Sequence, residues 1–159
     1  MLGVPRGIRS TVFRLIESRL KCDPVLKGAI AKWYTWDGAP ESASGQAVIP
    51  TPSIRLTPAL GPVTWYGPAE HGGMLQIKID LLTRTLNADD PLDLWEAIER
   101  AIYPASRTEE LAWEQSLRDA HAWTGQINLS QPTTIQQADD NQILSSGLIE
   151  IEIHRILAP

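Results

Sequence analysis

Residues 74–82 read MLQIKIDLL and carry the clearest secondary-structure signal in this chain. Aliphatic residues occupy every second position from Leu75 to Leu81, and polar residues occupy the positions between them. A period of two is typical of a β-strand that buries one face. Residues 148–153, LIEIEI, repeat the pattern much later in the chain. Two such strands predict a sheet that is covered on one face.

The segment before the first of these strands predicts a β-hairpin. Residues 53–60 alternate between apolar and polar side chains, although Pro58 should confine this strand to an edge or end it early. Trp65 and Tyr66 follow, and a Gly- and Pro-containing stretch, residues 67–73, comes next. We therefore expect an antiparallel hairpin whose loop is too long for a tight two-residue turn.

Helices are predicted on both sides of this hairpin. Residues 9–21 place apolar side chains on one helical stripe. Asp-Pro pairs at positions 23–24 and 90–91 each supply a helix cap and a suitable first residue, and residues 108–117 form a further helical segment. The predicted fold class is α+β: an antiparallel β-sheet with α-helices packed on one face, plus a long β-hairpin and loop arms.

Two stretches lack strong periodicity. Residues 38–52 are rich in Gly, Ala, Ser and Pro, which predicts an extended surface loop. Residues 126–146 have a weak pattern, with short strands expected around 127–129 and 134–136.

The composition predicts one soluble domain that spans residues 1–159. Apolar residues make up 43% of the chain, which is enough for a single core. A formal net charge of -5 disfavours stable binding to nucleic acid. The longest apolar runs are too short for a membrane-spanning helix, and no signal peptide is visible. Cys22 is the only cysteine, which fits a reducing cytoplasm and excludes an intrachain disulfide.

No group of residues in the sequence predicts a catalytic site, a metal site or a cofactor. His71, His121 and His154 lie far apart and lack the spacing that places two metal ligands on one helical face. The sequence also contains no phosphate-binding or dinucleotide-binding glycine motif and no nucleophile elbow. Cys22 is explained more simply by packing than by a nucleophilic role.

Glu150 and Glu152 share one face of the predicted C-terminal strand. Paired carboxylates can act as general acid and base. A cross-strand polar ladder with Gln76 and Lys78 explains them more simply.

Tryptophan is the unusual feature of the composition, with six residues against a single phenylalanine. Trp95 lies on a predicted helix and is the best candidate for the core. Two aromatic clusters border Gly- and Pro-rich loops: Trp33, Tyr34 and Trp36 in one, Trp65 and Tyr66 in the other. Aromatic residues in such places are common anchors of protein interfaces, but core packing explains these two clusters equally well.

The order of these segments resembles that of the tail terminator, or tail completion, proteins of tailed bacteriophages. The resemblance lies in a leading helix, an aromatic segment, a hairpin that ends in residues 72–80 (GGMLQIKID), residues 90–98 (DPLDLWEAI) and the final strand 148–153 (LIEIEI). It covers the chain except residues 105–146, which we expect to be an inserted or variable region.

This resemblance implies a non-enzymatic structural protein of the virion, in its tail or neck, that is assembled in the host cytoplasm. Such a protein forms a ring, expected to be hexameric, on the phage tail tube. The ring ends tube polymerisation and joins the tail to the head-tail connector or stopper protein, and a sheath protein is a further candidate partner. DNA would pass through the lumen without specific binding, and no membrane is involved.

The resemblance also implies where contacts lie. The sheet would lie near the lumen, so Asp80, Glu150 and Glu152 are expected to form an acidic wall. Residues 38–52 and 65–73 would reach neighbouring subunits or tail proteins. The residues expected at these protein interfaces are Trp33, Tyr34, Trp36, Trp65, Tyr66 and His71.

Two alternatives remain open. Another phage neck or connector protein, such as a stopper or head completion protein, would share the same patterns. A small enzyme or ligand-binding α+β domain, with Cys22 or a pair of histidines in a pocket, is the alternative from another class.

Overall fold

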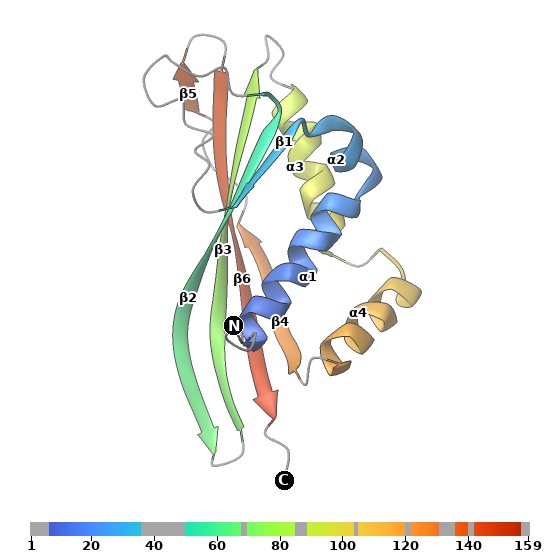
Figure 1. Cartoon of the computed structure of the whole chain (residues 1–159), viewed down its shortest axis with the longest axis vertical. Coiled ribbons are helices and arrows are strands. Elements are labelled where there is room, and N and C mark those ends of the chain that lie inside the picture. Colours follow the sequence, from blue (N-terminus) through green and yellow to red (C-terminus); the bar gives the residue numbers. More distant parts are fainter. Residues whose placement is uncertain are drawn as a thin grey trace, which may run out of the picture.

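The computed structural model describes residues 7–35, 50–67, 70–84, 89–103, 105–119, 122–130, 136–139 and 142–156. It confirms an α+β fold, in which the helices lie on one face of a β-sheet (Figure 1). The elements in chain order are α1 (Ile8–Cys22), α2 (Pro24–Ala29), β1 (Lys32–Thr35), β2 (Ser53–Gly67), β3 (Glu70–Arg84), α3 (Asp89–Ile102), α4 (Arg107–Asp119), β4 (Ala122–Ser130), β5 (Gln136–Asp139) and β6 (Gln142–Ile156). Among the described helices, none is long and apolar enough to cross a bilayer.

Five strands follow one another across the sheet in the order β1-β2-β3-β6-β4, and β5 also pairs with β6. β1 runs parallel to β2, whereas all other pairs are antiparallel. The sheet is therefore mixed and not fully antiparallel as expected. The alternation of residues in a four-residue strand does not encode its direction, and most of the predicted loop 38–52 between β1 and β2 lies outside the described residues.

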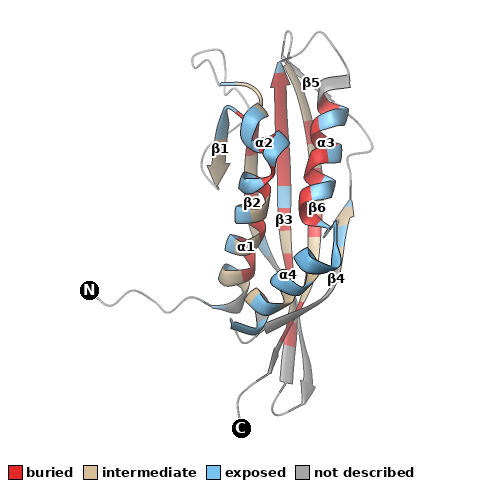
Figure 2. Cartoon of the chain, turned by 90° about the vertical axis from the view of Figure 1, so that its right-hand side faces the viewer, coloured by how far each residue is buried: buried red, intermediate tan, exposed pale blue. Residues whose placement is uncertain are grey.

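The register of the central strands brings the aliphatic residues together on one face. Leu75 pairs with Ile151 and Ile77 pairs with Ile149 across β3 and β6, and all four side chains are buried. Figure 2 shows these two strands beneath α1 and α3, with their buried residues in red. The period of two in both segments thus produces a continuous apolar surface for the helices to cover.

An apolar stripe explains why α1 packs on the sheet, and a capping carboxylate explains where α2 begins. Val12, Ile16 and Leu20 are spaced four residues apart on α1 and are fully buried. The carboxylate of Asp23 then accepts hydrogen bonds from the backbone N–H groups two and three residues further on, at 2.9 and 3.0 Å. This cap ends α1 and starts α2 within a single residue.

The predicted core position of Trp95 is confirmed, since only 3% of its surface is exposed. Its ring packs against Gly147 of β6, where a side chain would collide with it. On α4, Trp113 is buried, and the guanidinium carbon of Arg19 lies 5.3 Å from its ring centroid. The two tryptophans thus help to fix α3 and α4 to the rest of the molecule.

The hairpin differs from its prediction in two ways. β2 continues through Pro58 as far as Gly67. β1 ends opposite Leu56, and beyond that point no other described strand pairs with this side of β2, so it lies at an edge, which tolerates a residue without an N–H group. Gly67 pairs with Glu70, so only two residues separate the strands. The expected long loop is wrong, because most of it belongs to the paired strands.

β6 connects the two halves of the sheet. It pairs with β3 over its whole length, and on its other side it pairs first with β5 and then with β4. Residues 105–146, expected as an inserted or variable region, contribute α4, β4, β5 and the start of β6. Ile127 and Leu129 of β4 pack against the core, so this stretch is part of the same layered structure.

Candidate assembly surface

The face of the sheet that the helices leave uncovered carries the predicted acidic residues. The register aligns two polar rows on this face: Arg55, Asp80 and Ser146 in one, Gln76, Glu150 and Asn128 in the other. Glu152 is two residues beyond Glu150 on β6 and so shares the face. The three acidic residues of the expected wall therefore lie on one side of the sheet.

Asp80, however, is not available as a free negative charge. Its side chain is only 1% exposed. Arg55 donates to it through Nη2 at 2.8 Å and through Nε at 3.1 Å, and Lys78 Nζ lies 3.4 Å away. The hydroxyl of Ser146 donates to the other carboxylate oxygen. This corrects the expectation of an exposed acidic residue at this position, because Asp80 is buried and two cations more than offset its single negative charge.

Glu150 and Glu152 are both partly exposed. Glu150 lies opposite Gln76, which agrees with a cross-strand polar ladder, whereas Lys78 lies opposite Leu148 and directs its charge to Asp80. The Oε1 atom of Glu152 is 2.8 Å from Nε2 of His154, which is mostly buried on the same face. Of the expected wall, these two glutamates are the residues that retain contact with solvent.

The first aromatic cluster lies on β1, at one edge of the sheet. Trp33 and Tyr34 are both half-buried, and Trp33 also packs against the core. The Nζ atom of Lys21 lies 6.0 Å from the ring centroid of Trp33, and that of Lys32 lies 5.8 Å from the ring centroid of Tyr34. Both cations are exposed, so this edge combines aromatic area with positive charge. Trp36 lies outside the described residues.

The second aromatic cluster is far from the first. Trp65 pairs with His71 near the tip of the β2–β3 hairpin, and Tyr66 follows it in β2; the side chains of these three residues lie outside the described part of the structure. Trp33 pairs with Ile54, eleven residues before Trp65, which corresponds to about 36 Å along a strand. The two predicted clusters therefore form separate surfaces and not one patch.

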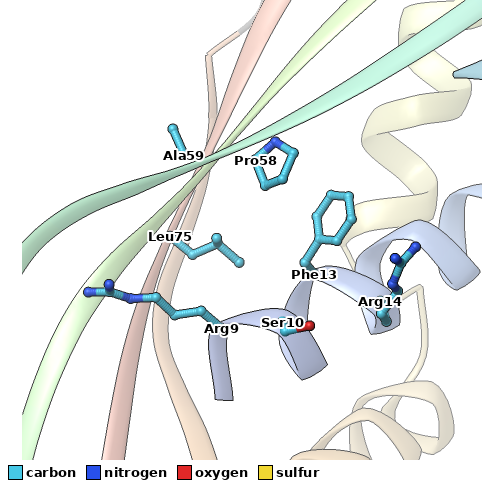
Figure 3. Close-up of a pocket in the computed structure, with 7 residues that line it drawn as sticks. All are labelled: Arg9, Ser10, Phe13, Arg14, Pro58, Ala59 and Leu75. Carbon is cyan, nitrogen blue, oxygen red and sulfur yellow. The ribbon is translucent and has the colours of Figure 1, made fainter. Parts of the chain in front are cut away.

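A groove that the sequence did not predict lies between α1 and the hairpin (Figure 3). It has a volume of about 340 Å³. Its lining combines apolar and cationic side chains: Arg9, Ser10, Phe13, Arg14, Pro58, Ala59 and Leu75. The guanidinium of Arg9 lies against Gly73 of β3, where a Cβ atom would collide with it. The spacing of residues along the chain gives no signal for this contact, because it joins a helix start to a strand far away in sequence.

A second hollow, of about 350 Å³, lies where α1 and α2 meet α3 and α4. Cys22 is exposed there and shares the lining with Asp23, Arg100 and Glu109, and no histidine is found among the described residues of this lining. Arg19 also lines it, and burial lowers the pKa of its guanidinium, while the charge of Glu109 opposes that shift. In the part of the chain that the structure describes, no cluster of histidine, cysteine, aspartate or glutamate has a geometry that could hold a metal ion.

The sequence matches none of the protein-family models and none of the curated proteins with which it was compared.

Proposed function

We propose that this protein is a structural virion protein, a tail terminator, that forms a ring on the end of a phage tail tube. The ring ends tube polymerisation and joins the tail to the head-tail connector. The proposal begins from the order of segments in the sequence, in which a leading helix, a hairpin, an Asp-Pro helix and a final alternating strand follow each other.

The observation that carries the proposal is the division of the molecule into two unlike layers with a projecting arm. The helices lie on one face of the sheet, and the β2–β3 hairpin continues past the helix layer (Figure 1). In a ring of such subunits, the sheet layer can line the lumen while the helix layer faces outward. The hairpin can then contact the tail-tube ring beneath it, with Trp65, Tyr66 and His71 close to its tip.

The polar chemistry of the uncovered face agrees with a passage for DNA. Arg55 and Lys78 are both engaged by the buried Asp80, which reduces their attraction for a phosphate backbone. Glu150 and Glu152 remain partly exposed, and the whole chain carries a formal net charge of -5. A wall of this kind repels DNA weakly and does not hold it.

The test is light scattering coupled to size-exclusion chromatography, first on the protein alone and then with its tail-tube protein. Hexamers that form alone or only in the presence of tube protein, together with tubes whose growth stops on addition of this protein, are the expected results. A protein that binds no tube protein and leaves tube growth unchanged would exclude the terminator role. Binding to a connector or stopper protein without binding to the tube would point to a different neck protein.

A further inference from the structure

The groove between α1 and the hairpin has an apolar floor that belongs to the core. Phe13 of α1 and Leu75 of β3 form this floor, and only 5% and 2% of their surfaces are exposed. Pro58 of β2 is partly exposed beside them, and Figure 3 shows the three side chains around a common space. The floor is therefore already fixed in the folded protein, which lowers the free-energy cost of binding a ligand there.

The rim of the groove is positively charged. The guanidinium groups of Arg9 and Arg14 lie on opposite sides of the space above the floor (Figure 3). No acidic residue is found among the described residues of the lining, and the first turn of α1 contains none either. The groove is thus a positive, apolar place on a chain whose formal net charge is -5. Its charge is complementary to that of an anionic ligand.

Arg14 is able to turn toward such a ligand. Its side chain is 52% exposed, and Nη1 donates to Glu17 Oε1 at 3.1 Å. Lys21 Nζ lies 3.6 Å from the same oxygen, so Glu17 keeps a cation when Arg14 moves away. Ion pairs at the surface contribute little to stability and exchange partners easily. The charge of Arg14 is therefore available to a ligand in the groove.

The groove lies at an edge of the sheet. β1 pairs with β2 only as far as Leu56, and Pro58 and Ala59 lie just beyond that point. Proline has no N–H group to donate to a further strand, so this edge is poorly suited to bind a partner by strand addition. A partner that lies along the edge here would be held chiefly by its side chains.

We propose that this groove binds an extended segment of a partner protein, in which an apolar side chain lies between two acidic ones. The apolar side chain would contact Phe13 and Leu75, and the carboxylates would pair with Arg9 and Arg14. A small molecule with a single carboxylate would engage only one of these arginines, because they lie on opposite sides of the floor. Neither the hairpin tip nor the association of copies takes part, so this inference holds or fails independently of the terminator role.

The test is a titration of fluorescein-labelled heptapeptides with the full-length protein, followed by fluorescence anisotropy. The probe has Glu-Leu-Glu at its centre between Gly-Ser pairs, and the matched peptides have Gln-Leu-Gln or Glu-Ala-Glu there. The probe should bind at least about tenfold tighter than the Gln-Leu-Gln peptide and about fivefold tighter than the Glu-Ala-Glu peptide. This comparison uses only the wild-type protein, so no folding defect can affect it.

Two variants locate the binding site. R9Q/R14Q should weaken binding of the probe at least about tenfold, because it removes both cations of the rim. R107Q/R118Q is the matched control: it removes the same charge from α4, where each arginine also pairs with a glutamate of its own helix, and it should bind like the wild type. S10W should block the groove without altering the core, since Ser10 is exposed on its rim. Circular dichroism verifies that each variant is folded.

Equal affinity for the three peptides, or no binding of the probe, would overturn the inference. An equal loss in the two arginine variants would also overturn it, because it would show a general attraction between charges. Octanoate, an apolar anion with one carboxylate, provides the last comparison. If it displaced the probe at lower concentration than the unlabelled peptide does, the groove would be a site for a small molecule and the assignment to a protein segment would be wrong.

Discussion

The indole Nε1 of Trp95 donates a hydrogen bond of 2.7 Å to the hydroxyl of Ser145, and both residues are buried on the helix-covered face of the sheet. An indole N–H needs an acceptor when it leaves water. Ser145 of β6 supplies this acceptor, although the positions around it on the same face of the sheet are apolar.

Replacement of Ser145 by alanine should therefore destabilise the protein. It leaves a buried donor unsatisfied, at a cost of about 1–3 kcal/mol in the free energy of unfolding. Urea denaturation followed by tryptophan fluorescence measures the change. S116A is the control, because Ser116 is partly exposed on α4 and its hydroxyl donates to a backbone carbonyl of its own helix. In the W95F background S145A should cost much less, and an equal loss there would argue against the hydrogen bond.

Gly147 should not tolerate even an alanine. A Cβ atom at this position would lie 2.7 Å from Cη2 of Trp95 and 2.9 Å from the carbonyl oxygen of Ser130. One neighbour is a buried ring and the other is backbone, so we expect G147A to cost about 1–3 kcal/mol in urea denaturation. G28A provides a control of opposite sign, since nothing lies within 4 Å of the new atom on α2 and alanine favours a helix. Equal effects of the two substitutions would contradict this packing.

Gly73 should behave differently from Gly147, although it is also crowded. Its neighbour is the guanidinium of Arg9, the far end of a flexible side chain. G73A should displace that group and change the unfolding free energy by no more than about 0.5 kcal/mol. Arg9 would then shift within the groove that it lines with Phe13. A loss as large as that of G147A in the same titration would show that Arg9 is held rigidly.

The buried pair of Asp80 and Arg55 should make a large contribution to stability. D80N removes the charge that Arg55 and Lys78 surround, and we expect a loss of about 3 kcal/mol. K78A should cost less than about 1 kcal/mol, because the lysine side chain is 52% exposed. Thermal and urea unfolding of both variants compare them directly. Similar losses of unfolding free energy in D80N and K78A would show that the buried Asp80–Arg55 pair stabilises the fold no more than the exposed Lys78 does.

Removal of the aromatic pair near the hairpin tip should weaken assembly and leave the subunit folded. W65A/Y66A lies where the hairpin extends beyond the helices, far from the core that Trp95 and Trp113 help to form. Light scattering in the presence of tube protein should show less bound protein, while the far-ultraviolet circular dichroism stays unchanged. Unaltered assembly would count against a contact at this end of the molecule.

The core strands were predictable because their signal is local. The alternation from Leu75 to Leu81 and in residues 148–153 directly specifies which side chains are buried. The cap at Asp23 and the apolar stripe of α1 were also predictable, because each depends on residues that lie close together in the sequence. β1 was not predicted as a strand, because residues 32–35 are too few to show a period of two, and its parallel pairing with β2 joins it to residues on the far side of a long connection.

The candidate site was less predictable because its properties depend on register. Asp80 is an ordinary polar position within its strand, and only the alignment of β2 with β3 places Arg55 beside it. Gly72 and Gly73 predicted a loop, since glycine commonly interrupts strands, yet both lie within β3. Because Gly73 has no side chain, the guanidinium of Arg9, which belongs to α1, can lie directly against its backbone.

The central place of β6 has a consequence for how the chain acquires its structure. Among the described strands, β4 and β5 each pair only with β6, and β6 follows them in the chain. During synthesis, α1, α2 and the β2–β3 hairpin can form early from nearby residues, but β3 keeps one unsatisfied edge until β6 emerges. An exposed edge of this kind is prone to pair with other chains. The nascent protein thus passes through a period in which premature aggregation competes with completion of its own sheet.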